Sequence, residues 1–295
     1  MYPSSFDYRR PQTVAEALEL QADADGEVEL LAGGHSLIPT MKSGLAEPDL
    51  LIDISDIDEL RGVEVGDETT TFGALTTYAT IANHEGAQET CPTLTAAASQ
   101  VGDIQVRNRG TIGGNVAHAD PASDLPGAVL AENATVHVQG PDGAREIPID
   151  EFFFGMYATD VGPDEILTAV EVPNADDNTV GTYVKKPNPA SGYALVGVAV
   201  SLQVAGGTVE SARVAANGAI DHGTRLASVE DALAGEQIDD DLAESASAGA
   251  GDDIEEYLFM EDLHASAEFR QQLLKVYTER ALDAAFERAG ERVEA

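Results

Sequence analysis

Cysteine and tryptophan are nearly missing from this chain, which has one cysteine, Cys91, and no tryptophan in 295 residues. A single thiol excludes a disulfide within the chain, and it excludes an iron–sulfur cluster held by this chain alone. No apolar run approaches the roughly 18 residues that a membrane-spanning helix needs. The N-terminal segment has neither the apolar core of a secretory signal nor a twin-arginine signal. These absences predict a cytoplasmic protein without a membrane span.

Basic residues are also scarce. The chain has 16 lysines and arginines against 53 acidic residues, which gives a net charge of −37. The acidic residues are spread along the chain and do not form a tail. A dispersed acidic surface predicts a protein that works in high salt, as in a halophile, because screening over a few Å removes most self-repulsion. The same charge argues against nucleic acid as a partner, since phosphates require a basic surface.

The length exceeds what one hydrophobic core usually spans, so two or three domains are expected. In the first unit, Thr13 is the predicted N-cap of a helix over residues 13–20, and Glu16 completes a capping box. The unit is also predicted to contain a strand at 28–31, a short helix at 36–41 and a strand at 50–54. Together these segments make a β-α-β-like unit that ends near residue 56.

The second unit mixes short helices with strands, as judged from turn residues and hydrophobic spacing. Its predicted elements are a hairpin at 63–65 and 69–72, helices at 76–83, 92–101 and 124–132, and strands at 135–138, 146–149 and 166–172. The polar, breaker-rich stretch 173–181 then predicts a domain boundary.

The third unit is predicted to pack a long helix on a sheet. Its predicted elements are strands at 182–186, 194–204 and 208–216 and a helix from residue 266 to about residue 288. On that helix Leu273, Leu274, Tyr277, Ala281 and Phe286 recur at helical spacing. The acidic, Ala/Ser-rich stretch 236–253 is expected to be exposed helix or loop.

Two double-glycine turns are the strongest candidates for a binding site. Gly33–Gly34 is followed by His35–Ser36, and Gly113–Gly114 is followed by Asn115. Adjacent glycines let consecutive N–H groups point the same way and let a ligand approach the backbone. Either turn alone is also explained as a tight turn, but a pair of them suits a dinucleotide, which carries two linked phosphates.

Charged residues near the second turn leave two readings open. From residue 62 to residue 184 the basic residues are Arg107, Arg109 and Arg145, and two of these precede the turn. They either offset a bound diphosphate or pair with acids such as Asp103. Likewise, His118 with its neighbouring acids either binds a metal or acts in acid–base chemistry, or it only caps and turns the chain.

Other catalytic signatures are missing. Neither turn is a GxGxxG motif, and no helix is predicted directly after residues 111–115, so a Rossmann domain is not expected. The six histidines lack HxH and HxxxH spacing, so no metal site is predicted. No GxSxG or GxxxxGK[ST] motif occurs either, so no catalytic residue is assigned.

The segments AGGHSLIPTMKSG and QVRNRGTIGGNVAHADPASDLPGAVLA resemble the two FAD-binding signatures of the flavoprotein subunits of molybdenum hydroxylases. The resemblance extends to the opening YPSSFDYRRPQTVAEAL and to ILTAVEVP, and it covers essentially the whole chain. The resemblance is strongest to the medium subunit of aerobic carbon monoxide dehydrogenase and to the FAD segment of xanthine dehydrogenase.

The resemblance implies an α+β fold. Residues 1–176 would form a vanillyl-alcohol-oxidase-like (PCMH-type) FAD-binding domain with lobes 1–56 and 57–176. Residues 177–295 would form the family's C-terminal α+β domain, with a small antiparallel sheet and helices. The flavin would lie between the two lobes.

The resemblance also implies the FAD-binding residues. Backbone N–H groups from two segments would contact the diphosphate and ribityl chain, namely Ala32, Gly33, Gly34, His35, Ser36 and Leu37, and Thr111, Ile112, Gly113, Gly114 and Asn115. Asp124 would hydrogen-bond the cofactor, and Leu167 would lie close to the flavin ring. Lys185 would lie near the isoalloxazine and Tyr193 would cover one ring face, unless they are a surface lysine and a core tyrosine. Arg107, Arg109 and Lys185 would favour the anionic reduced flavin.

The function implied is electron transfer within a multi-subunit oxidoreductase. A large molybdopterin subunit would act on the substrate, and a small [2Fe–2S] subunit would pass electrons to FAD on this chain. The three subunits would form a heterotrimer, and two heterotrimers would form a dimer. FAD would then reduce a quinone, NAD or another acceptor. The alternatives are a standalone flavin oxidoreductase and a flavin-free structural subunit. Asn188, Pro189 and Gly192 depart from the family's RRAGDYA pattern at the flavin edge, and the substrate is not encoded in this chain.

Overall fold

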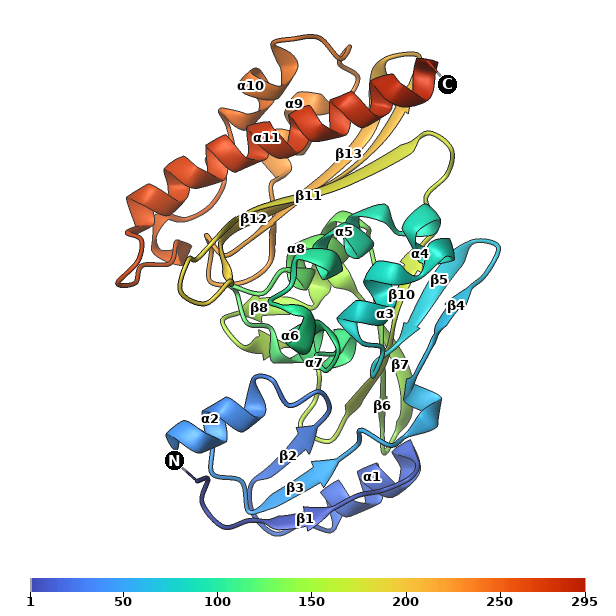
Figure 1. Ribbon diagram of the computed structural model, residues 1–295, viewed down its shortest axis with the longest axis vertical. Coiled ribbons are helices and arrows are strands. Elements are labelled where there is room, and N and C mark those ends of the chain that lie inside the picture. Colours follow the sequence, from blue (N-terminus) through green and yellow to red (C-terminus); the bar gives the residue numbers. More distant parts are fainter. Residues whose placement is uncertain (1, 295) are drawn as a thin grey trace.

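The N-terminal lobe is built on a parallel three-stranded sheet with the strand order β1-β3-β2 (Figure 1). The computed structural model describes residues 2–294, with side chains described through residue 290. The elements of this lobe are β1 (Asp7–Arg9), α1 (Val14–Ala22), β2 (Val28–Leu31), α2 (Leu37–Ser43) and β3 (Leu50–Asp53). The predicted elements are confirmed. The sequence did not predict β1, because a strand of three exposed residues carries no hydrophobic pattern.

Helix α1 begins as its capping residue predicts. The hydroxyl of Thr13 accepts a hydrogen bond from the N–H of Glu16 at 3.1 Å. The Glu16 carboxylate accepts from the N–H of Gln12 at 2.7 Å, one residue before the partner that a standard capping box would use. Val14 and Ala17 on the inner face are buried against the sheet, so the first lobe has a small core of its own.

The middle lobe pairs an antiparallel sheet of order β4-β5-β10-β6-β7 with a group of short helices (Figure 1). The strands are β4 (Val63–Val65), β5 (Thr69–Gly73), β6 (Thr135–Gly140), β7 (Gly143–Pro148) and β10 (Ile166–Pro173). The helices are α3 (Tyr78–Asn83), α4 (Glu85–Thr90), α5 (Pro92–Gln100), α6 (Ile104–Arg107), α7 (Ile112–His118) and α8 (Leu125–Ala131), with η1 (Asp58–Leu60), η2 (Ile149–Glu151) and the hairpin β8 (Phe153–Gly155)–β9 (Ala158–Thr159). Strand β6 alternates buried and half-buried residues, because only one face meets the helices.

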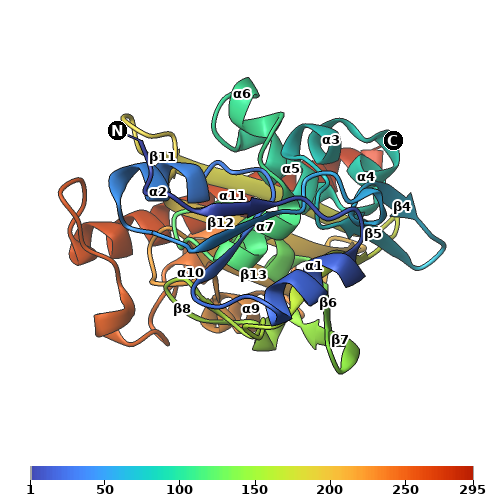
Figure 2. The ribbon, with the colours of Figure 1, turned by 90° about the horizontal axis from the view of Figure 1, so that it is seen from below.

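The second glycine turn corrects one expectation, since it is itself the first turn of helix α7. Thr111 is the N-cap, and its hydroxyl accepts from the N–H of Gly114 at 3.3 Å. Glycine is needed at 113 because a β-carbon there would lie 2.5 Å from the Cβ of Ala74. The sequence predicted a glycine turn with no helix directly after it, whereas these glycines let a helix pack closely on its neighbour. In both Figure 1 and Figure 2, α7 faces the N-terminal lobe.

The C-terminal domain is an antiparallel sheet between two helical layers. Its elements are β11 (Thr179–Pro187), β12 (Ala194–Ala205), β13 (Thr208–Asn217), β14 (Thr224–Arg225), α9 (Ala227–Leu233), α10 (Leu242–Ser247), η3 (Glu256–Leu258) and α11 (Ala267–Glu294). The long helix α11 crosses one face of the sheet (Figure 1), and helices α5 and α8 of the middle lobe contact the other. Gly181 permits the latter contact, because a β-carbon there would lie 2.4 Å from the hydroxyl of Thr93.

The stretch 236–253 differs from expectation. It contains helix α10, which packs against α9 and α11 and buries Leu242, Ala243, Ala246 and Ser247. The small residues that suggested exposure instead allow close helix packing. The long helix, the two-domain arrangement and the α+β class are as predicted. Within residues 2–294, no helix is both long enough and apolar enough to cross a membrane.

Candidate functional site

A cavity of about 600 Å³ lies where the N-terminal lobe, the middle lobe and the β11–β12 turn meet. Most of the residues predicted for the site line it, namely Ala32, Gly33, Gly34, His35, Ser36, Leu37, Thr111, Gly113, Gly114, Asn115, Asp124, Leu167 and Tyr193. Ile112 and Lys185 do not. The Ile112 side chain is fully buried in the core of the middle lobe. Segments far apart in the sequence therefore share one cavity.

The two glycine turns meet at this cavity. A β-carbon on Gly33 would lie 2.3 Å from the carbonyl oxygen of Arg109 and 3.0 Å from the Cα of Gly110. A β-carbon on Gly114 would lie 3.6 Å from the Cβ of Ala32. Gly34 has a φ of 77°, which a residue with a side chain rarely adopts. The missing side chains thus bring the two turns together as well as leaving room for a ligand.

The turns differ in the donors that they offer. Among the described residues, the backbone N–H groups of residues 33–36 form no hydrogen bond within the protein. In the second turn, the N–H groups of Ile112 and Gly113 donate to the carbonyls of Thr76 and Ala74 at 3.0 and 2.8 Å. Those of Gly114 and Asn115 also have partners, both on Thr111. Of the two turns, only the first therefore has N–H groups at residues 33–36 that are left for a ligand, whereas the second allows close approach of a ligand to its backbone.

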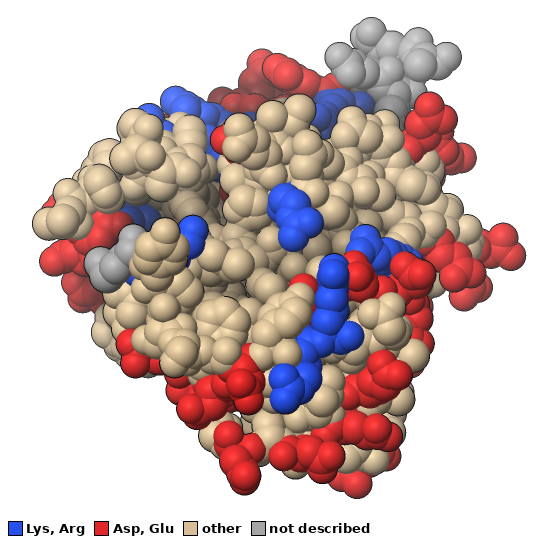
Figure 3. Space-filling view, turned by 60° about the horizontal axis from the view of Figure 1, so that its bottom comes forward, with Lys and Arg blue, Asp and Glu red and all other residues tan. Residues whose placement is uncertain are grey.

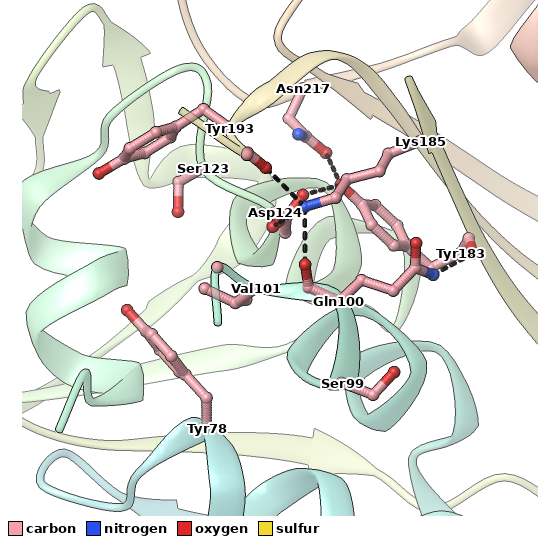
Figure 4. Close-up of polar contacts among 12 residues, drawn as sticks. Tyr78, Ser99, Gln100, Val101, Ser123, Asp124, Tyr183, Lys185, Tyr193 and Asn217 are labelled. Atoms are coloured by element: carbon pink, nitrogen blue, oxygen red, sulfur yellow. Dashed lines mark hydrogen bonds and ion pairs between the residues drawn. The ribbon is translucent and has the colours of Figure 1, made fainter. Parts of the chain in front are cut away.

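Lys185 lies behind Asp124 in a buried network that joins the middle lobe to the C-terminal sheet (Figure 4). Its ammonium donates to Asp124 Oδ2 at 2.8 Å, to the Gln100 carbonyl at 2.8 Å and to the Gly192 carbonyl at 3.1 Å. The hydroxyl of Tyr183 donates to Asp124 Oδ1 at 2.6 Å. All three ammonium protons therefore have protein partners. The positive charge of Lys185 is neutralised by the Asp124 carboxylate, which lies between it and the cavity.

Burial raises the pKa of Asp124 above its ordinary value, while the Lys185 ammonium and the Tyr183 hydroxyl oppose that rise. Burial likewise raises the pKa of Tyr183 well above its ordinary value, and the nearby Asp124 adds to the effect. Tyr183 consequently stays a hydrogen-bond donor to the carboxylate. The network fixes the carboxyl group of Asp124 at the cavity wall.

A second hydrogen-bonded group in the cavity wall was not predicted. The side-chain amide of Asn115 donates to the Tyr78 hydroxyl at 2.8 Å and accepts from the Ser123 hydroxyl at 2.8 Å. Burial raises the pKa of Tyr78, so its hydroxyl stays protonated. In Figure 4 the rings of Tyr78 and Tyr193 lie on either side of Ser123. No local pattern marks Tyr78, because its role depends on contact with a helix 37 residues away.

The charged residues near the second turn have contacts that neither open interpretation predicted. Asp103 caps helix α6 through the N–H groups of Gln105 and Val106 at 2.8 and 2.9 Å. Arg107 does not pair with it, and donates instead to the carbonyls at 101 and 102. Arg107 and Arg109 do not line the cavity. The structure therefore supports neither a pairing of Arg107 with Asp103 nor a position of the two arginines beside a bound diphosphate.

The group around His118 forms a turn. Asp120 Oδ1 accepts from the N–H of Ala122 at 2.9 Å, and the His118 ring packs 5.0 Å from the ring of Tyr157. Burial lowers the pKa of His118. Among the described residues, no group of three or more His, Cys, Asp or Glu side chains could hold a metal ion. The segment thus has the capping and packing contacts of a turn, and His118 and Asp120 also line the cavity.

The site fits FAD by its own geometry. The cavity lies between two lobes, and the N–H groups of residues 33–36, which have no protein partner in the part of the chain that the structure describes, can donate to phosphate oxygens. The glycines of both turns leave the backbone open to a ligand. Tyr157 and Tyr193 supply aromatic surfaces. These features define a dinucleotide-binding protein whose phosphate site uses backbone rather than lysine.

Comparison with known proteins identifies the group more narrowly. Residues 4–175 match the family described as FAD binding domain in molybdopterin dehydrogenase, and residues 181–285 match the CO dehydrogenase flavoprotein C-terminal domain. The carbon monoxide dehydrogenase medium chain of Hydrogenophaga pseudoflava is 35% identical over 288 residues, covering 98% of this chain and 99% of that one. The glyceraldehyde dehydrogenase medium chain of Sulfolobus acidocaldarius is 34% identical and covers 95% and 98%.

Solved structures agree. Carbon monoxide dehydrogenase from Hydrogenophaga pseudoflava superposes with a TM-score of 0.93 at 36% identity, covering 98% of this chain and 99% of that one. Quinoline 2-oxidoreductase from Pseudomonas putida 86 gives a TM-score of 0.91 at 29% identity, with the same coverage. This chain belongs to the FAD-binding medium subunits of the molybdopterin-containing dehydrogenases, and the fold, cofactor and oxidoreductase class predicted from its sequence are confirmed.

Proposed function

We propose that this chain passes electrons from the [2Fe–2S] centres of a small partner subunit to an external acceptor, downstream of a large molybdopterin subunit. FAD, when bound, supplies a redox group that takes up and releases those electrons. The chain itself binds and orients that group. Its one cysteine leaves the iron–sulfur clusters to another chain. The acceptor is a quinone, NAD or another oxidant.

One observation carries the proposal, namely that the turns at 32–37 and 111–115 line one cavity, with Gly33 close to the backbone of Arg109, which directly precedes the second turn. We assign the diphosphate to the free N–H groups of residues 33–36. Asp124 would accept a hydrogen bond from the cofactor, and Tyr193 would cover a ring face. Lys185 would act through Asp124, because its own protons are used within the protein.

The assembly that we propose is a dimer of heterotrimers with one small [2Fe–2S], one medium and one large molybdopterin subunit in each half. The names of the relatives support it, since they are medium chains or subunits of larger enzymes. We also propose the division into 1–176, with lobes 1–56 and 57–176, and 177–295. The family matches, which end at 175 and resume at 181, support the boundary.

The environment that we propose is the cytoplasm of a halophile. The net charge of −37 supports high salt. Figure 3 shows acidic side chains along the left, lower and right-hand margins of one face, while a stripe of basic side chains crosses its lower half. Such a surface repels itself in dilute buffer and is screened at molar salt.

Purification of the tagged chain from its native host tests the proposal. A large molybdopterin subunit and a small cysteine-rich subunit should co-purify with it, and the complex should show flavin and iron–sulfur absorption. An isolated chain that alone oxidises a substrate would identify a standalone flavoenzyme instead. A chain that lacks flavin absorption and fails to bind added FAD would identify a structural subunit.

A further inference from the structure

The two ends of the cavity differ in their polar groups. At one end, Lys185 ties the Gln100 and Gly192 carbonyls together, and Val101 and Tyr193 line the space beside them (Figure 4). At the other end, Gln21 Nε2 donates to the Pro163 carbonyl at 2.5 Å and joins helix α1 to the middle lobe. Both Gln21 and Pro163 line the cavity, so this contact forms part of its wall.

The Gln21 end holds hydrogen-bond acceptors without donors. Gln21 Oε1 is buried and has no hydrogen-bond partner among the described residues. A buried acceptor without a donor destabilises the fold, so a donor from a ligand would be favoured at this position. The amide orientation is fixed, because a flip that exchanged Oε1 and Nε2 would place an oxygen against the Pro163 carbonyl, where a donor is needed.

Glu29 adds a second acceptor at this end. It lies in strand β2, which is the first strand after the helix that carries Gln21. Both residues line the cavity, and the Glu29 carboxylate forms no hydrogen bond or ion pair within the described part of the chain. Burial, with a smaller contribution from Glu27, raises the pKa of Glu29.

The chemistry of FAD distinguishes its two ring systems. The adenine carries an exocyclic amino group with two N–H donors, whereas the polar edge of the isoalloxazine presents two carbonyl acceptors around one N–H. A pair of unpartnered acceptors therefore suits the adenine and would leave flavin carbonyls facing like charge. We propose that Gln21 and Glu29 form the adenine subsite, in which Gln21 Oε1 and the Glu29 carboxylate accept from the 6-amino group.

The assignment rests on the proposed FAD function and fixes the direction in which the dinucleotide lies. The diphosphate lies at residues 33–36, and the flavin lies toward Val101 and Tyr193. Leu167 follows Glu165 on the wall near Pro163. The assignment therefore sets Leu167 beside the adenine, in contrast to the flavin-ring position that the family resemblance implied.

Titration of the FAD-depleted full chain with two dinucleotides tests the subsite. One is FAD, and the other is the analogue with purine in place of adenine, which lacks only the 6-amino group. Quenching of flavin fluorescence measures both affinities without any turnover. We expect the wild-type chain to prefer FAD by about tenfold, the worth of one or two hydrogen bonds in a buried site.

Two variants of Gln21 separate the acceptor from the wall contact. Gln21→Met removes both, and the preference should fall to near unity. Gln21→Glu also loses the bond to Pro163 but keeps acceptor oxygens, so it should retain the preference. At the second position, Glu29→Met should reduce the preference severalfold. Glu27→Gln, which removes a neighbouring charge outside the cavity, should leave it unchanged.

The outcomes are distinct. Equal affinity of the wild-type chain for FAD and its purine analogue would overturn the subsite and leave FAD binding intact. An undiminished preference in Gln21→Met would also overturn it. Failure of the full chain to bind either dinucleotide would overturn the proposed function and the subsite together.

Discussion

A β-carbon on Gly33 would lie 2.3 Å from the backbone carbonyl oxygen of Arg109. The first belongs to the N-terminal lobe and the second to the middle lobe, 76 residues later in the sequence. Contacts shorter than 3.0 Å force movement, and a backbone carbonyl held by its own turn has little room to move. The absence of one side chain thus sets how closely the two lobes approach across the cavity.

Gly33→Ala should therefore weaken FAD binding at least about tenfold, because a shift of even 1 Å at a binding turn is costly. FAD content after purification and affinity by fluorescence quenching measure the effect. Gly290→Ala is the matched control, since a β-carbon there meets open space on helix α11. It should bind FAD normally and unfold at the same or a slightly higher temperature. Normal FAD affinity in Gly33→Ala would show that the lobes can separate without consequence.

Lys185→Met should destabilise the chain by about 3–5 kcal/mol, because it leaves the carboxylate of Asp124 buried without its cation. The side chains of Lys185 and Asp124 are only 6% and 4% exposed. Adding Asp124→Asn should recover most of the loss. Denaturant unfolding of the single and double variants measures the coupling.

The exposed pair Lys275–Asp252, with side chains 43% and 65% exposed, provides the comparison. Lys275→Met should cost less than about 1 kcal/mol. A loss of that small size for Lys185→Met as well would mean that water reaches Asp124.

Glu132 should make stability fall as pH rises. Burial raises its pKa from 4.5 to about 8, although the N–H of Thr93 donates to it at 2.7 Å. Between those two pH values the folded chain keeps a proton that the unfolded chain has lost, so raising the pH favours unfolding. Its contribution is full below pH 4.5 and is lost progressively by about pH 8, on the order of a few kcal/mol.

Glu132→Gln cannot titrate and keeps an oxygen for Thr93. It should flatten the decline in unfolding free energy between mildly acidic and mildly alkaline pH. Glu89→Gln, at an exposed position on helix α4, should leave the decline unchanged. Parallel pH profiles for wild type and Glu132→Gln would refute the assignment.

Salt should stabilise the chain. At a net charge of −37, raising KCl from about 0.1 M to about 2 M shortens the screening length from roughly 10 Å to under 3 Å and removes most repulsion between surface carboxylates. The midpoint of thermal unfolding should rise by on the order of 10 °C or more. The experiment uses a chloride salt, because sulfate is excluded from the protein surface and would raise the midpoint by strengthening apolar burial as well as by screening charge. A midpoint independent of KCl would contradict the high-salt reading.

Local signals predicted the elements well. Thr13 as an N-cap, Pro92 at the start of α5 and the apolar spacing of Leu274, Tyr277 and Ala281 on α11 act within one or two turns of chain, so they can be read directly. The double glycines were likewise visible. Their interpretation as turns failed at Gly113, because its need for space comes from Ala74 on another segment.

The sequence by itself determined most of the helices and strands, the acidic composition and the positions of the paired glycines, because each depends on neighbours in the chain or on composition. Only the tertiary structure decided which polar groups remain free. Lys185 finds its acceptors 85, 61 and 7 residues away, and Gln21 finds Pro163 across 142 residues. Each donor proton and each lone pair takes part in one good hydrogen bond, so whether one is left for a ligand is set by contacts that form when distant segments meet.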